Sequence, residues 1–99
     1  MVQAMRDAGI PADISDAAGT FCCNHLMYGV LHYLSQSDSP IRAGWIHLPY
    51  LPEVAARVEN LGEPSMSVET STAGVRMGIE AALTHPEDID AASPSRLQI

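Results

Sequence analysis

The sequence predicts an α/β fold built on parallel-type strands. Two short apolar segments alternate with helix-like segments, a glycine turn joins the first apolar segment to the helix after it, and a proline bounds the second. The order helix, strand, helix, strand, helix is the right-handed crossover of open α/β sheets. Such sheets need helices on both faces, and two strands are too few for three helices. We therefore expect further strands outside these 99 residues.

The first half of the chain predicts a helix, a strand and a second helix. Residues 1–8 are compatible with a helix that stops at Gly9, and residues 12–17 predict a short strand. A turn at Gly19 then leads into a helix over residues 21–36, because apolar residues recur there at helical spacing. These residues are Leu26, Met27, Val30, Leu31 and Leu34.

The second half adds a strand and further helices. Residues 43–48 predict the second strand, and residues 53–61 can form one or two helical turns. A last helix, capped by Ser65 or Ser67, is expected to end at about Thr84. Its expected inner face comprises Val68, Val75, Ile79, Ala82 and Leu83.

Two glycines interrupt this last helix. Gly74 and Gly78 each cost about 1 kcal/mol relative to alanine, so we expect them to serve close packing on a sheet. Beyond the helix, acidic residues mix with Ala, Ser and Pro without periodicity. We therefore divide the chain into a folded region, residues 1–85, and an acidic tail, residues 86–99.

Composition argues against several classes of partner. Five Lys and Arg against twelve Asp and Glu give a net charge of -7, the wrong sign for nucleic acid or an anionic membrane surface. No apolar run approaches the roughly 20 residues of a bilayer span, and Arg6 and Asp7 interrupt any signal peptide. We expect a cytoplasmic protein in which the adjacent Cys22 and Cys23 are reduced thiols.

Cys23 is the candidate nucleophile. It lies at the start of the helix that follows the Gly19 turn, where unpaired backbone N–H groups and the helix dipole stabilise a thiolate. The thiol also shares the apolar face of that helix with Met27 and Val30, so a buried structural cysteine is the competing interpretation.

The two histidines of this helix are poor candidates for the base. At 100° per residue, His25 and His32 fall about 180° to 200° from Cys23, on the opposite face. With Cys22 beside them they still offer too few ligands for a zinc site, and polar-face histidines are the simpler interpretation. We predict no metal, and the base must come from another element.

His47 is the candidate base, because it ends the second predicted strand, at the edge where catalytic groups gather in parallel sheets. A structural histidine is the alternative. The aromatic residues Phe21, Trp45 and Tyr50 flank the two groups and either line an apolar pocket or pack in the core. Asp16 either orients His47 or is a solvated loop carboxylate.

Two segments resemble one family. Residues 18–29, AGTFCCNHLMYG, resemble the nucleophile segment of bacterial pyrrolidone-carboxylate peptidases, and residues 44–53, GWIHLPYLPE, are similar to the base segment of the same enzymes. The Pro-Ser-Met run at residues 64–66 also fits. The resemblance covers most of residues 1–85 in the family order.

The resemblance implies a cysteine peptidase that hydrolyses the amide after an N-terminal pyroglutamyl residue. Cys23 would be the nucleophile, His47 the base, and Phe21 part of the pocket for the pyroglutamyl ring. The implied fold is a three-layer α/β/α sandwich, of which this chain would be the C-terminal half. The family commonly forms tetramers and needs no cofactor.

Two departures from the family pattern bear on activity. The third catalytic residue of the family, a glutamate, lies in the N-terminal half, which nothing in this sequence matches. Cys22 also replaces an expected aliphatic residue. The alternative function is therefore a catalytically inactive remnant that acts only as an association or binding module.

Overall fold

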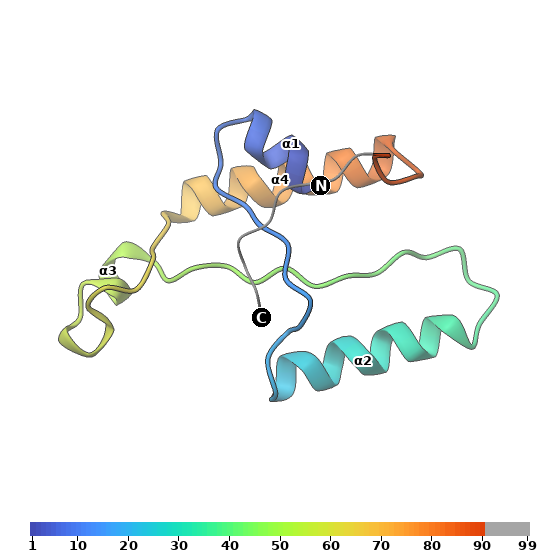
Figure 1. Cartoon of the computed structure of the whole chain (residues 1–99), viewed down its shortest axis with the longest axis horizontal. Coiled ribbons are helices and arrows are strands. Elements are labelled where there is room, and N and C mark those ends of the chain that lie inside the picture. The colour runs from blue at the N-terminus through green and yellow to red at the C-terminus, as the bar shows by residue number, and fades with distance from the viewer. Residues whose placement is uncertain (91–99) are drawn as a thin grey trace. The chain divides into compact units, whose positions relative to one another are not determined.

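A computed structural model describes residues 1–90 of the chain, drawn in Figure 1. The helices are α1 (Val2–Asp7), α2 (Cys22–Ser35), α3 (Pro52–Ala55) and α4 (Val68–Thr84), with a 3-10 helix, η1, at Val58–Asn60. These residues form two compact units. The first unit comprises residues 1–14 and 48–90, and the second unit comprises Ser15–His47.

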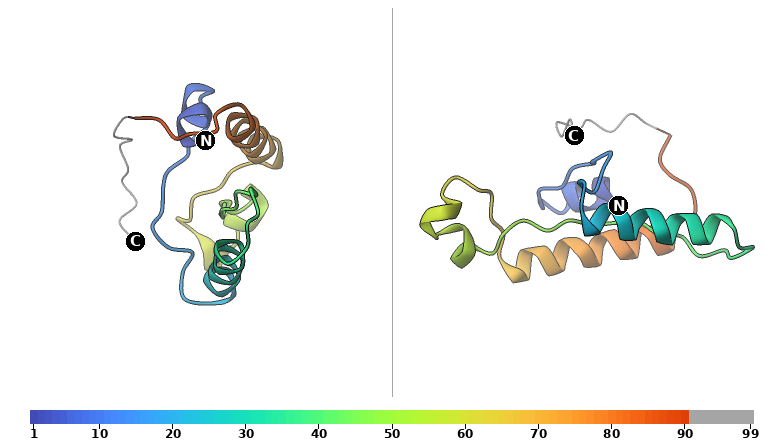
Figure 2. Two further views of the ribbon diagram at one scale, coloured as in Figure 1. Left: turned by 90° about the vertical axis from the view of Figure 1, so that its right-hand side faces the viewer. Right: turned by 90° about the horizontal axis from the view of Figure 1, so that it is seen from below.

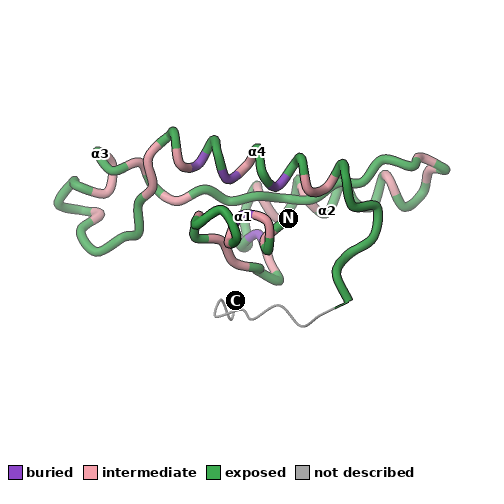
Figure 3. Tube along the Cα trace, turned by 90° about the horizontal axis from the view of Figure 1, so that it is seen from above, coloured by how far each residue is buried: buried purple, intermediate pink, exposed green. Residues whose placement is uncertain are grey.

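In the first unit, α1 packs on α4 through small residues. Ser71, Gly74 and Gly78 are the buried positions of α4, and Figure 3 shows them along one side of that helix. A Cβ atom added at Gly78 would lie 2.5 Å from the terminal methyl of Met5, the buried residue of α1. The predicted close packing at the glycines is thus confirmed, but the partners are Met5 of α1 at Gly78 and Ile10, just after α1, at Gly74, and not a sheet.

The predicted inner face of α4 is not its buried face. Val68, Ile79 and Leu83 are 54%, 50% and 76% exposed. At 100° per residue, these three residues lie about 100° to 160° around the helix from the midpoint of Gly74 and Gly78. Val75 and Ala82, the other two residues of the predicted face, are half-buried, so the prediction holds only in part. Apolar periodicity identifies a face that favours burial, without showing which neighbour is present to bury it.

The segment after α1 is held by a helix stop and by one arginine. Gly9 adopts a positive φ of 76°, and its N–H donates to the carbonyl of Arg6 at 2.9 Å, as expected for a glycine just past a helix end. The Arg6 guanidinium donates to the Ala12 carbonyl at 2.9 Å and pairs with Asp13 at 3.1 Å. Side-chain contacts therefore hold the start of the segment predicted as the first strand.

Neither predicted strand forms within residues 1–90. Residues 12–17 and 43–48 have no ladder partner, and the β pairing described is an isolated parallel bridge between Tyr50 and Ser65. A strand exists only when a neighbouring chain segment satisfies its backbone N–H and C=O groups. The predicted crossover between two paired parallel strands is therefore corrected to two unpaired segments.

The remaining helices agree with the predicted ranges. α3 begins with proline at its first turn, and the side-chain amide of Asn60 in η1 donates to the Val54 carbonyl at 3.0 Å. Ser67 is the cap of α4, since its Oγ accepts from the N–H of Thr70 at 3.1 Å. α4 ends at Thr84, where the sequence predicted its end.

The acidic tail is described only in part. Residues 86–90 are exposed and lie in no helix or strand, while residues 91–99 of the predicted tail lie outside the described residues. Among residues 1–90, none of the helices is both long enough and apolar enough to cross a bilayer.

Candidate active site

The N-terminus of α2 offers unpaired backbone donors around Cys23. Gly19, with a φ of 84°, makes the predicted turn, and the helix begins when the N–H of His25 donates to the carbonyl of Phe21 at 3.1 Å. No side chain caps this helix, and its first turn carries no acidic residue. Within the described part of the chain, the N–H groups of Cys22 and Cys23 are not hydrogen-bonded. Such a helix terminus favours an anion, whether a thiolate or an oxyanion.

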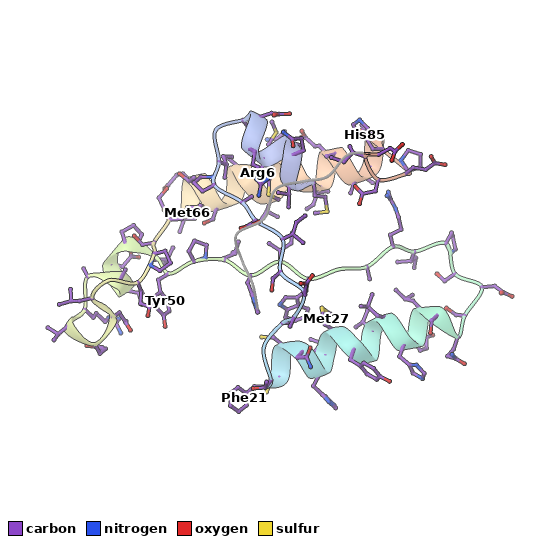
Figure 4. The ribbon with its side chains drawn as sticks, viewed as in Figure 1. Arg6, Phe21, Met27, Tyr50, Met66 and His85 are labelled. Carbon is purple, nitrogen blue, oxygen red and sulfur yellow. The ribbon has the colours of Figure 1, made fainter. Side chains whose placement is uncertain are left out.

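The two thiols differ in exposure. Both cysteines are free, but Cys22 is exposed whereas Cys23 is half-buried. Met27, one turn further along α2, lies on the side of the helix toward the segment that follows (Figure 4). Because Cys23 and Met27 are separated by about 40° around the helix, the Cys23 thiol points toward the same side.

The chain then returns along α2 and brings His47 back toward the start of the helix. After α2, an extended segment runs beside the helix in the opposite direction, as Figure 1 and Figure 2 show. A helix of 14 residues is about 21 Å long, a distance that roughly seven extended residues cover. Residues 41–47 are therefore long enough to make this return. Cys23 and His47 belong to the same unit, although no hydrogen bond joins their side chains in the described structure.

The imidazole of His47 is exposed and has one aromatic neighbour. The Trp45 and His47 ring centroids lie 6.2 Å apart with an interplanar angle of 82°. Residues two apart in an extended chain share a face, so the spacing of Trp45 and His47 in the sequence already indicated this contact. Asp16, the local candidate for orienting His47, is exposed, and among residues 1–90 it makes no hydrogen bond to the imidazole. The described residues therefore supply no carboxylate partner for His47.

The three aromatic residues of the predicted pocket are all exposed in the described structure. The Phe21 ring is 85% exposed and projects from the start of α2 in Figure 4. Trp45 lies in the second unit and contacts His47, whereas Tyr50 belongs to the first unit. Each of these three residues keeps more than a third of its surface exposed, so none is a buried core residue in the described structure.

The other two histidines of α2 lie on its polar side. Both are exposed, and the His32 ring stacks on Tyr28 with centroids 5.9 Å apart. The described residues contain no group of three or more His, Cys, Asp or Glu side chains placed to hold a metal ion.

Comparison with known proteins assigns the chain to a family of peptidases. The family model described as pyroglutamyl peptidase matches residues 1–85. The pyrrolidone-carboxylate peptidase of Mycobacterium tuberculosis is 69% identical over 99 residues, which are 100% of this chain and 45% of the relative. That of Brevibacillus brevis is 47% identical over 89 residues, covering 90% of this chain and 40% of the relative.

A solved structure supports the same family assignment. The crystal structure of pyroglutamyl peptidase I from Bacillus amyloliquefaciens matches with a TM-score of 0.82 and 37% sequence identity, over 92% of this chain and 42% of that one. The chain therefore belongs to the pyroglutamyl peptidase family. It spans less than half the length of the relatives that it matches.

Proposed function

We propose that this chain supplies the nucleophile and general base of a cysteine peptidase that removes N-terminal pyroglutamate from peptides. The observation that carries the proposal is the placement of Cys23 in the first turn of α2, beside unpaired N–H groups, with His47 ending the segment that returns along the same helix. Family membership supports the same assignment, because the relatives are pyrrolidone-carboxylate peptidases.

The proposed reaction uses only protein groups and water. His47 takes the proton of Cys23, and the thiolate attacks the carbonyl carbon of the amide that joins pyroglutamate to the next residue. The backbone N–H groups at the start of α2 stabilise the oxyanion of the tetrahedral intermediate. Its collapse expels the peptide amine, which takes the proton from His47, and water then hydrolyses the thioester to release pyroglutamate. No cofactor takes part.

The proposed activity requires more of the family domain than this chain provides. His47 has no carboxylate partner in the described structure, and losing an orienting acid costs about 10⁴ in rate in the analogous serine triad. By the resemblance, the missing glutamate and part of the pocket lie in an N-terminal half. Joined to that half, residues 1–85 would complete a three-layer α/β/α sandwich, and Phe21 would help to enclose the pyroglutamyl ring.

Location and assembly are part of the proposal. Catalysis by Cys23 requires a reduced thiol, and both cysteines are free, which suits the cytoplasm. Assembly as a tetramer follows from the resemblance alone. A second candidate function, an inactive module that only associates with other chains, is favoured by the large exposed apolar side chains of α2 and of residues 41–50.

The test uses a joined protein. The portion of the M. tuberculosis relative that lies outside its match to this chain is placed upstream of Met1 in one polypeptide, and hydrolysis of a pyroglutamyl-coumarin reporter is measured. We expect turnover that Cys23→Ser abolishes. A folded joined protein without turnover would reject the peptidase proposal and favour the association module.

A further inference from the structure

Two thiols lie side by side at the start of α2, and the proposed peptidase reaction uses only one of them. Cys22 and Cys23 are the first two residues of the helix, and both are free. Cys22 is exposed and Cys23 is half-buried, so both residues are open to small solutes. Cysteines that react reversibly with oxidants are accessible to solvent and often have a second, resolving cysteine beside them.

The start of the helix favours the reactive form of these thiols. Within the described residues, the N–H groups of Cys22 and Cys23 are not hydrogen-bonded, no side chain caps α2, and its first turn carries no acidic residue. Unpaired N–H groups and the helix dipole favour a thiolate, which is the form that a hydroperoxide oxidises. The sulfur that attacks a peptide carbonyl in the proposed function is therefore also open to oxidation.

A disulfide between adjacent cysteines is strained, and strain makes it easy to reverse. Successive Cα atoms are about 3.8 Å apart, whereas disulfides usually join Cα atoms about 4.4–6.8 Å apart. Strained or exposed disulfides are the ones that are readily reduced and serve regulation. The peptide that must distort lies in the first turn of α2, where the Cys23 N–H has no hydrogen bond to lose among the described residues. Residues 19–21, just before the helix, are exposed, so little packing resists the distortion.

We infer that Cys22 is a resolving thiol that protects Cys23 from irreversible oxidation. A hydroperoxide transfers one oxygen atom to the Cys23 thiolate, which becomes a sulfenic acid, and the hydroxide or alkoxide that leaves takes a proton from water. The Cys22 thiol then attacks the Cys23 sulfur, the S–O bond breaks, and the hydroxyl leaves as water with the Cys22 proton. A dithiol reductant restores both thiols and is itself oxidised to a disulfide. Cys22 thereby adds redox control to the proposed function, on which the reactivity of Cys23 rests.

A disulfide between two copies of the chain is the competing product. Cys22 is exposed, but each copy carries a net charge of -7, which opposes the approach of a second copy. The neighbouring thiol in the same chain is already held close to the sulfenic acid, so attack within the chain has the advantage of proximity. The internal disulfide is therefore the favoured product.

Mass spectrometry of the oxidised joined protein tests for this disulfide without using catalysis. The protein is treated with hydrogen peroxide, free thiols are alkylated, and the tryptic peptide of residues 7–42 is measured, since it holds both cysteines of this chain. We expect this peptide to lose two hydrogen atoms and to resist alkylation until dithiothreitol is added. Oxygen adducts on Cys23 or links between two copies as the main product would overturn the inference.

Recovery of turnover provides the second measurement. Excess hydrogen peroxide should lower turnover of the pyroglutamyl reporter by at least about tenfold, and dithiothreitol should restore most of it, because a disulfide is reducible whereas a sulfinic acid is not. Cys22→Ser should lose turnover to the same extent but regain less than about a third of it, because its Cys23 sulfenic acid is oxidised further. Cys22→Ala repeats the comparison in case the serine variant fails to fold. Equal recovery with and without the Cys22 thiol would contradict the resolving role.

The two measurements distinguish failure of this inference from failure of the proposed function. A folded joined protein that forms the disulfide but has no turnover would support the resolving role of Cys22 and reject the peptidase proposal. Turnover that Cys23→Ser abolishes, in a protein that forms no internal disulfide, would support the peptidase proposal and reject the resolving role.

Discussion

The two units of this chain differ in how their helices are stabilised. In the first unit, α1 lies against the small residues of α4, a glycine ends α1, and the Ser67 hydroxyl caps α4. In the second unit, α2 has no side-chain cap and no fully buried residue. The candidate nucleophile and base both lie in this second, barely packed unit.

The residues that stabilise local structure and the residues proposed to carry out the chemistry therefore lie in different units. Short helices are marginal in water unless tertiary packing supports them, and α1, with six residues, obtains that support from α4. α2 is longer but exposes most of its apolar side. The helix that carries Cys23 therefore has less tertiary support among the described residues than α1, which packs on α4.

The largest effect should come from the nucleophile in the joined protein. Cys23→Ser should lower kcat/KM for the pyroglutamyl reporter by at least about 10³-fold, because the hydroxyl of serine is a much weaker nucleophile in a site built for a thiolate. Cys22→Ser, the matched control in the neighbouring exposed position, should retain most of the activity. Equal losses from the two substitutions would reject the assignment of Cys23.

The second largest effect should come from replacing His47, the proposed general base. His47→Gln should lower kcat by about 10²- to 10⁴-fold, the range for removing a general base. His32→Gln is the control, because that imidazole lies on the polar side of α2 and stacks on Tyr28. A greater loss from His32→Gln than from His47→Gln would show that the base had been misassigned.

A smaller effect should come from adding a side chain at a helix glycine, and its size should differ between the two units. Gly78→Val forces a side chain against Met5, and overpacking of this kind costs about 1–3 kcal/mol, which is roughly a 5- to 150-fold increase in the exchange of α1 amides. Gly29→Val is the matched control in α2, because a Cβ atom added there meets nothing within 4 Å. It should leave α1 exchange unchanged. Slow α1 exchange in the Gly78 variant would mean that α1 does not depend on this contact.

The smallest effect concerns the cap of α4. Ser67→Ala removes the acceptor for the Thr70 N–H and should destabilise the first turn of α4 by about 1 kcal/mol, or roughly fivefold in amide exchange. Ser65→Ala alters an exposed side chain nearby and should have less than half of that effect. Hydrogen exchange of the joined protein measures both, and identical behaviour of the two variants would show that the Ser67 hydroxyl does not stabilise the first turn of α4.

The sequence predicted what is encoded locally. The range of α2, the end of α4 at Thr84 and the Gly19 turn follow from spacing, capping and backbone freedom within a few residues, and Ser67 is one of the two predicted caps of α4. The strands predicted at residues 12–17 and 43–48 do not form among residues 1–90, because a strand requires a partner segment that local sequence does not specify. The expected inner face of α4 was right only in part for a related reason, since the neighbour that α4 meets is α1.

The candidate site could likewise be predicted only where it depends on local sequence. The position of Cys23 at a helix start is a local property, and the structure has it there. The pairing of His47 with an orienting carboxylate and the closure of a pocket around Phe21 involve residues distant in sequence. Neither is present among residues 1–90, and the roles of all three residues stay predictions. The ring contact between Trp45 and His47 was accessible from their spacing but was not anticipated.

Turnover by this chain alone, compared with the joined protein at equal concentration, tests the central claim most directly. The unpaired segments and bare helix faces predict that the chain alone hydrolyses little or no pyroglutamyl reporter and elutes from a sizing column as oligomers or as a loosely packed species. The joined protein should turn over the reporter through Cys23. A monodisperse, cooperatively unfolding monomer of this chain alone, with turnover equal to that of the joined protein, would show that these 99 residues form a complete active site.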